Sequence, residues 1–512
     1  MKKFLLYLAL LSLTACQHGT QTPASTVIIP TTVPIPSSTP RPQINIPSDI
    51  NPLTGLPVID SSLLKIPALL VSISNFPAIG RPQAGLSFAP FVYEYYITEG
   101  ATRFLAVFYG EFPAPEILPA GGCQVRSEPF VKTQTILGNR VWLDTNANGR
   151  LDIGEEGIPG VCVNLYDVNG NPVQQTSTDT NGYYGFNVQP GKYIVEFVKP
   201  KGMDFTERKP RDDTEDSAAD PLTGRVIVDV STDLLSIDAG LVPSVNPPPA
   251  SNSSTIMPLA QIGPIRSGRL IYGYIGDYFQ NSCLIYAFAS PEEQARIPEC
   301  YMVFHQLAGG GYMLDISEMI KVAQANKKEK GSDFNYSSNL FVNEPQTGGT
   351  PASKLNIYFA YQNQSGWLYD PLYQAYLRYV DTSEYDQAGI LHGDTDRLTR
   401  RQLHFENVIV LFAKHEVISP TNLDIHLDPG KTGQALLLRD GQMYKIKWST
   451  VPNEVDQMAG MTHPIQFLNL DDSLAPLKPG HTWILVVTPD STIEEKSAGA
   501  WTLTFSQPPG AN

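Results

Sequence analysis

Residues 138–163 read "GNRVWLDTNANGRLDIGEEGIPGVCV" and place acidic and amide side chains around one glycine, between two strand-like segments. From Asp144 the spacing is Asp-x-Asn-x-Asn-Gly-x5-Glu, which fits a twelve-residue calcium loop at every side-chain position. Calcium needs six to eight hard oxygen ligands, and Gly149 lets the chain turn sharply around the ion. A polar hairpin without metal is the alternative. The expected ligands are Asp144, Asn146, Asn148, the carbonyl of Arg150, Asp152 and Glu155.

The segments that flank this loop predict strands. "RVWL" precedes it and "GVCVNLYDV" follows it, so we expect the loop to join strands and not the two helices of a calcium sensor. Apolar residues then alternate with a period of two, for example at Val226, Val228 and Val230, with turn residues between the runs. This pattern predicts a β-sandwich. A second acidic cluster at 212–224 has looser spacing and offers three further oxygen ligands, Asp213, Asp216 and Asp220.

Residues 137–243 resemble the B-type repeat domain of serine–aspartate adhesins (SdrD B-like), which is related to the Cna-B fold. The resemblance rests on the loop above, on "STDTNGYYGFNVQPGKYIVEF" and on "IDAGLV". It implies a calcium-rigidified β-sandwich that acts as a spacer at the cell surface. Ser217-Ala218 departs from the Asp-Ser-Asp that is typical of the second cluster and removes a carboxylate there. Some related domains have a Lys–Asn isopeptide bond, but the first strand offers Arg140 and no lysine, so none is expected.

The sequence on both sides of this module resembles the YerB-like lipoproteins, through "NPLTGLPV", "RPQAGLS" and "TRFLAVF" upstream and "GPIRS" downstream. That resemblance implies an α/β N-terminal domain and a β-rich C-terminal domain of unassigned function. We therefore predict an α+β host with an inserted all-β sandwich, because an insertion that folds by itself costs a loop little. The expected parts are 49–120 and 259–350 (N-terminal domain of the host), 351–495 (C-terminal domain), 137–243 (insert), 121–136 and 244–258 (linkers) and 496–512 (tail).

The first sixteen residues, "MKKFLLYLALLSLTAC", predict a lipoprotein signal peptide whose lipobox ends at Cys16. Cleavage there would leave a lipidated cysteine that anchors the protein in the outer face of the membrane. Residues 17–48 are rich in Pro, Thr and Ser and predict an extended stalk. The formal net charge of −15 becomes −17 without Lys2 and Lys3, which excludes a nucleic-acid partner and favours cation binding.

Four further cysteines lie in a part of the chain that we expect to be exported, where disulfide bonds are stable. The pairs considered are Cys283 with Cys300 and Cys123 with Cys162. Free buried thiols are the alternative.

Four arginines of the host lie in motif-like segments and are candidate anion ligands: Arg81, Arg103, Arg266 and Arg269. Converging guanidinium groups bind phosphate or carboxylate bidentately. The alternative is that they pair inside the fold with Glu94 and Glu99. Two weaker candidates are His305 and the "HGDTD" segment with His392, Asp394 and Asp396, which a core histidine and a polar hairpin explain equally well.

No Gly-x-Ser-x-Gly, Walker-type loop or His-Glu-x-x-His is present, so we expect no enzyme. The sequence favours a surface-displayed lipoprotein of the cell envelope that binds or scaffolds a cell-wall polymer or a surface protein. Structural Ca²⁺ would stiffen its inserted spacer. The alternative is an envelope enzyme that acts on a phosphorylated cell-wall polymer through the arginines.

Overall fold

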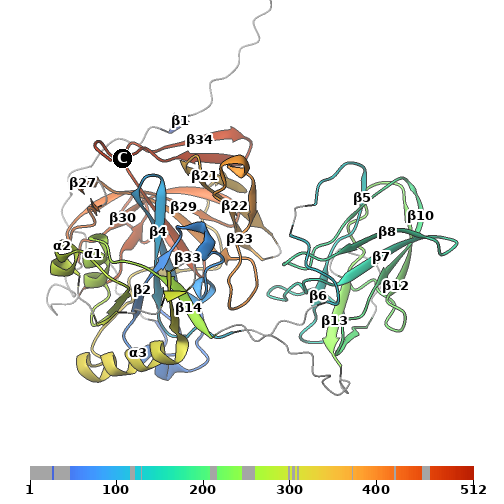
Figure 1. The fold of residues 1–512 in the computed structure, drawn as a ribbon, viewed down its shortest axis with the longest axis horizontal. Coiled ribbons are helices and arrows are strands. Elements are labelled where there is room, and N and C mark those ends of the chain that lie inside the picture. The colour runs from blue at the N-terminus through green and yellow to red at the C-terminus, as the bar shows by residue number, and fades with distance from the viewer. Residues whose placement is uncertain are drawn as a thin grey trace, which may run out of the picture.

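The computed structural model describes most of the chain in two bodies, the insert and the host (Figure 1). The described residues are 26–27, 46–115, 121–127, 130–207, 216–244, 260–297, 300–302, 306–307, 311–371, 373–419, 422–452 and 462–511. Cys16, Asp213 and His305 lie outside them. In the part of the chain that is described, no helix has the length and apolar character needed to span a bilayer.

The insert is a β-sandwich with its own hydrophobic core. One sheet has the order β12-β10-β7-β8 and a second the order β11-β13-β6, with β5 and β9 paired beside them. Strand β12 alternates exposed and buried residues over its whole length, which places Val226, Val228 and Val230 in the core as the period of two predicts. The strands are β5 (Thr135–Leu137), β6 (Val141–Leu143), β7 (Cys162–Asp167), β8 (Pro172–Ser177), β9 (Phe186–Val188), β10 (Gly191–Phe197), β11 (Met203–Phe205), β12 (Arg225–Val230) and β13 (Ala239–Pro243).

The segment expected to be the first linker belongs structurally to the insert. It contributes β5, and a disulfide bond joins Cys123 to Cys162 at the start of β7. Both cysteine pairs considered from the sequence are joined, the second being Cys283 with Cys300 in the host.

The larger host sheet has 14 strands among the described residues and continues through both parts of the host. Strand β3 pairs in parallel with β33, 391 positions apart at Phe91 and Thr482, so the expected N- and C-terminal domains share one sheet and one core. The strands are β2 (Leu69–Ser74), β3 (Phe91–Thr98), β4 (Ala101–Phe108), β14 (Gln261–Ile265), β15 (Cys283–Tyr286), β16 (Tyr301–Met302), β17 (Gln306–Leu307), β18 (Gly311–Asp315), β20 (Thr350–Pro351), β26 (Asn407–Phe412), β29 (Thr432–Arg439), β30 (Gln442–Ser449), β31 (Gln466–Leu468) and β33 (Thr482–Val487).

The second host sheet has eight strands among the described residues. Residues 496–512, expected to be a tail, contribute β35, because Trp501 and Leu503 are buried and pair the strand with β21. Residues 17–48 were expected to be an unpaired stalk, but Thr26–Val27 pairs with the edge strand β34, whose free backbone groups accept another strand. The strands are β1 (Thr26–Val27), β21 (Lys354–Ala360), β22 (Asn363–Asp370), β23 (Ala375–Asp381), β24 (Leu391–Gly393), β25 (His404–Phe405), β34 (Thr492–Ser497) and β35 (Ala500–Thr504).

Few helices cover these sheets, so the protein is β-rich. The amphipathic segment 316–330 forms helix α3, and its buried side chains include Ile316, Met319 and Ala323. Two further strand pairs complete the fold. The remaining elements are α1 (Ile271–Tyr278), α2 (Pro291–Arg296), α3 (Ile316–Lys330), η1 (Ser61–Lys65), η2 (Ala78–Gly80), η3 (Leu86–Phe88), η4 (Tyr385–Gln387), β19 (Leu340–Phe341) with β32 (Pro476–Leu477), and β27 (His415–Ser419) with β28 (Asn422–Ile425).

Candidate functional site

The acidic loop of the insert joins two strands, as its flanks predict. It follows β6 and leads through Gly157, which bridges back to Trp142, toward β7. Gly149 has a φ of 76°, the left-handed conformation that the sharp turn of such a loop requires.

The side chains of this loop bind one another and the loop backbone. Asp144 accepts hydrogen bonds from the backbone N–H groups of Asn148 and Gly149, at 3.1 and 2.8 Å, and from the hydroxyl of Thr206 at 2.6 Å. Glu155 accepts from the N–H of Thr145 at 2.7 Å and from that of Asp152 at 3.0 Å. The loop is therefore preorganised, with its carboxylates turned inward.

Two carboxylates of the loop are buried, and no basic side chain among the described residues pairs with either of them. Asp144 is 1% and Glu155 5% exposed, and the groups that bond to them are backbone N–H groups and hydroxyls. Burial of uncompensated charge costs several kcal/mol, and a bound cation would offset that cost. The oxygen donors of the loop fit calcium chemically. Within the described residues, however, no three His, Cys, Asp or Glu side chains are grouped closely enough to hold a metal ion.

The remaining acidic residues have other partners. Asp216 lies against the loop, where the Nε of Arg150 is 3.2 Å from its carboxylate and the N–H of Ser217 donates to the carbonyl of Gly149. Asp220 accepts bonds from Leu222 and Thr223 and caps a tight turn. These contacts connect Asp216 with the first cluster and give Asp220 a structural role.

In the host, Arg81 is an internal strut. Its guanidinium donates to the carbonyl of Asp381 at 2.7 Å and to the Asn75 side chain at 3.1 Å, and it lies over the ring of Phe76. It is therefore committed to holding η2 (Ala78–Gly80) against β23.

The alternative, that these arginines pair with Glu94 inside the fold, is wrong for the described residues. Glu94 lies opposite Phe104 in the β3–β4 ladder and Arg103 lies opposite Tyr95, so the side chains of Glu94 and Arg103 point to opposite faces. Glu94 pairs instead with the buried Arg378. Glu99 lies in the turn between β3 and β4 with a φ of 50°.

The other three arginines converge at the end of β14. Arg103 of β4 and Arg269 both donate to the hydroxyl of Ser267, at 2.7 and 2.9 Å. Arg269 also contacts the carboxylate of Glu293 at 3.2 Å. Burial, followed by the like charges of Arg269 and Arg266, lowers the pKa of Arg103 to about 10. We call Arg103, Arg266 and Arg269 the arginine cluster.

Sequence reasoning missed the groups that position this cluster. Ser72 donates to the carbonyl of Ser267 and bonds to the hydroxyl of Tyr272, which contacts Tyr95. Glu293 also accepts from the N–H of Ser290 in the capping box of α2. The capping pattern "SPEE" was readable in the sequence, but nothing local joins it to Arg269.

The weaker histidine and aspartate candidates are not brought together as a metal site. Asp394 pairs with Arg378, and Asp396 accepts backbone N–H groups of Gly85 and Ser87. His392 lies on β24. Asp396 therefore binds the C-terminal part of the host to its N-terminal part, and Asp394 neutralises Arg378 within the C-terminal part.

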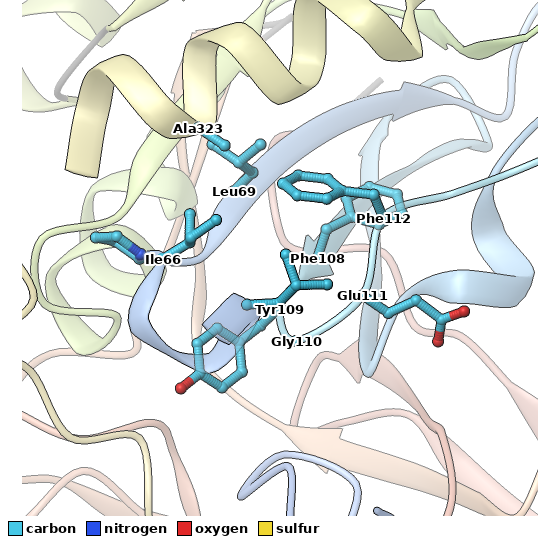
Figure 2. A pocket seen from close by; sticks show the side chains of 10 residues that line it. Ile66, Leu69, Phe108, Tyr109, Gly110, Glu111, Phe112 and Ala323 are labelled. Atoms are coloured by element: carbon cyan, nitrogen blue, oxygen red, sulfur yellow. The ribbon is translucent and has the colours of Figure 1, made fainter. Parts of the chain in front are cut away.

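Hollows in the described part of the host differ in free volume. One between η1, β4 and α3, lined by Leu69, Phe108, Phe112 and Ala323, has about 10 Å³ of free volume, which is room for a single water molecule (Figure 2). A shallow one of about 490 Å³ lies on the outer face of the eight-stranded sheet and is lined by Asn356, Tyr358, Gln364 and Thr502 among others. Neither hollow has a member of the arginine cluster in its lining.

Comparison with known proteins divides the chain as its architecture does. Residues 53–126 and 355–484 match the N- and C-terminal domains of a protein family of unknown function, DUF3048. Residues 135–241 match the SdrD B-like domain. An SdrD B-like match thus lies between matches to the two DUF3048 domains, and these two parts are called the SdrD B-like insert and the DUF3048 host. Both resemblances expected from the sequence are therefore confirmed.

Curated serine-aspartate repeat relatives match the SdrD B-like region. A fibrinogen-binding protein of Staphylococcus epidermidis is 51% identical over 83 residues, 16% of this chain and 8% of the relative. Serine-aspartate repeat-containing protein I of Staphylococcus saprophyticus is 52% identical over 71 residues, 14% of this chain and 4% of the relative. The chain thus spans under a tenth of these relatives. The crystal structure of YerB from Bacillus subtilis aligns with 86% of this chain and 96% of its own, at 16% identity and a TM-score of 0.44.

The SdrD B-like insert contacts the DUF3048 host through Arg140. The Arg140 guanidinium lies between the ring of Tyr183, which belongs to the insert, and the ring of Tyr373, which belongs to the host. It is 5.0 and 5.1 Å from their centroids and donates to the Tyr373 hydroxyl at 3.2 Å. Asn181 donates to Gln402 at 2.7 Å. Next to the acidic loop, Glu156 forms an ion pair with Arg401. The insert is therefore docked against the loops beside β23 (Figure 1).

Proposed function

We propose that this protein is a lipid-anchored binding or scaffold protein at the cell surface, in which calcium stiffens the SdrD B-like insert. The observation that carries the proposal is the buried pair Asp144 and Glu155, two carboxylates that have no basic partner among the described residues, in a loop whose spacing suits Ca²⁺. The signal sequence ending at Cys16 supports the anchor, and relatives of the insert are adhesin-type proteins.

Calcium would act on the orientation of the insert as well as on its stability. The carbonyl of Glu155 is 3.5 Å from the Arg140 guanidinium, and the next residue, Glu156, pairs with Arg401 of the host. An ion held by the carboxylate of Glu155 would thereby fix the segment that contacts the host. In this proposal the insert is a docked spacer with a set direction, not a free one.

Calorimetry of residues 17–512 in calcium and in chelator tests this proposal. We expect calcium to raise the melting temperature of the insert. Its free energy of unfolding should rise by about 2.7 kcal/mol when free Ca²⁺ is 100 times the dissociation constant. An equal melt in both conditions would refute the calcium loop and leave a polar hairpin.

An envelope enzyme acting on a phosphorylated polymer is the second candidate, and the arginine cluster is the observation that favours it. In the described chain the side chains bonded to the cluster are Ser267 and Glu293, and Glu293 is held by the capping box of α2. Arginines stabilise anionic groups but neither attack nor transfer protons at neutral pH. We therefore propose binding and not catalysis. Turnover of a phosphorylated polymer by the purified chain, lost in an Arg266→Ala variant, would reverse this choice.

A further inference from the structure

Among the described residues, the arginine cluster holds more positive charge than its surroundings neutralise. The guanidinium groups of Arg103 and Arg269 meet at Ser267, Arg266 is the preceding residue, and Glu293 is the carboxylate that contacts Arg269. One oxygen of Glu293 accepts from Arg269 and the other accepts from the N–H of Ser290. Because a guanidinium stays protonated in proteins, the cluster cannot relieve its repulsion by titration. An anion is the remaining means of neutralising it.

Another buried arginine shows what a structural role looks like in this fold. Arg378 is 1% exposed, contacts the carboxylates of both Glu94 and Asp394, and lies 4.6 Å from the centroid of Trp483. The two carboxylates neutralise its positive charge. Arg103 is 6% exposed, yet the polar groups it contacts are the uncharged hydroxyl and carbonyl of Ser267. Both arginines are buried, but of the two only Arg378 contacts carboxylates that neutralise its charge.

Donors of the cluster remain unused. The buried Nε atoms of Arg103, Arg266 and Arg269 have no hydrogen-bond partner among the described residues. No bond to the Arg266 side chain is present there either, although its backbone N–H and carbonyl are held by Ser72 and Ala287. Arg266 and Arg269 are partly exposed, so solvent and solutes reach the cluster. The cluster is therefore held in place by some of its donors, while its Nε donors have no partner among the described residues.

We propose that Arg103, Arg266 and Arg269 form a binding site for a phosphoryl group. Guanidinium groups bind phosphate oxygens through parallel N–H donors, and three of them suit a tetrahedral oxyanion better than a planar carboxylate. A phosphoryl group also brings one to two negative charges, which matches the surplus left after Glu293. The site deepens the proposed function, because it gives the host of a surface-displayed protein a ligand class.

Titration calorimetry of residues 17–512 with inorganic phosphate tests the site, at constant ionic strength and with acetate as the competing anion. We expect phosphate to bind and acetate to bind much more weakly. Arg266→Ala removes a side chain without bonded partners, so the variant should fold normally and bind phosphate at least about tenfold more weakly. Arg266→Lys should recover part of the affinity, since it keeps the charge and loses the fork. Arg296→Ala is the matched control, because Asp424 already neutralises that arginine.

Three outcomes would overturn the site: no binding of phosphate, equal binding of acetate, or unchanged binding in Arg266→Ala. Glycerol phosphate oligomers and vesicles of phosphatidylglycerol then distinguish a soluble polymer from a lipid headgroup as the source of the group. The calcium-dependent melt should be the same in Arg266→Ala and in the parent chain. Failure of the phosphate site therefore leaves the calcium proposal standing, and failure of the calcium proposal leaves the phosphate result intact.

Discussion

In the insert, Asp144 and Glu155 are buried with no basic partner among the described residues, whereas in the host the buried guanidinium of Arg378 lies against two carboxylates. Residues 137–243 also hold 17 acidic against nine basic side chains, which is about half of the surplus negative charge of the whole chain. The arginine cluster is a group of the opposite sign in the described part of the host. A buried charge that is paired with a charge of opposite sign has a structural role. A buried charge without such a partner indicates a ligand site.

The largest expected effect comes from removing Arg378, the buried cation of the host that two carboxylates neutralise. Arg378→Met leaves Glu94 and Asp394 buried without their cation, so it should lower the free energy of unfolding of the host by about 3–5 kcal/mol. Arg225→Met in the insert is the matched control, since its ion pair with Glu196 is half-exposed and contributes less than about 1 kcal/mol. Chemical denaturation measures both. Similar losses in the two variants would contradict the distinction between buried and exposed pairs.

The second-largest expected effect is a difference between the host and the insert in how their stability depends on pH. Burial lowers the pKa of His415 in the host to about 4, from an ordinary 6.5. The unfolded chain therefore binds a proton that the folded chain excludes between these values, and the host loses up to about 3 kcal/mol as the pH falls from 6.5 to 4. His415→Gln should flatten this dependence in a series of melts.

The insert provides the internal reference for that series. Residues 137–243 contain no histidine, and burial raises the pKa of Asp238 well above its ordinary value. A raised carboxyl pKa means that the folded state binds the proton more tightly, so Asp238 favours the folded insert as the pH falls. Parallel loss of both transitions in acid would rule out this account.

A third prediction concerns the buried carboxylates of the insert. Asp144→Asn removes one of the two uncompensated charges, so the transition of the insert should lose the calcium-dependent gain of about 2.7 kcal/mol. In chelator the variant should be at least as stable as the parent, because less negative charge is buried. Asp229→Asn, at an exposed carboxylate of β12, should keep the full calcium response. A calcium response that survives in Asp144→Asn would place the ion elsewhere.

Local patterns were readable from the sequence, and long-range partners were not. The acidic loop and the period of two in β12 depend on residues a few positions apart, so spacing alone predicts them. The partner of Glu94 is Arg378, 284 positions away, and Arg103 meets Ser267 across 164 positions. The sequence therefore indicated the arginines as a group but did not indicate Arg378 as the partner of Glu94. The parallel pairing of β3 with β33, which merges the two host domains, has no local signal either.

The smallest expected effect tests whether the two regions are coupled. Tyr373 of the host covers the buried Arg140 of the insert, and a cation–π contact of this kind contributes about 1 kcal/mol. Tyr373→Ala should leave both transitions nearly in place but remove the part of the calcium shift that reaches the host. Tyr361→Ala, which removes an exposed ring that contacts Tyr385 within the host, should leave that shift intact. If the host of the parent chain does not respond to calcium at all, or responds equally in Tyr373→Ala, the insert is an independent spacer, and the anion site of the host works without it.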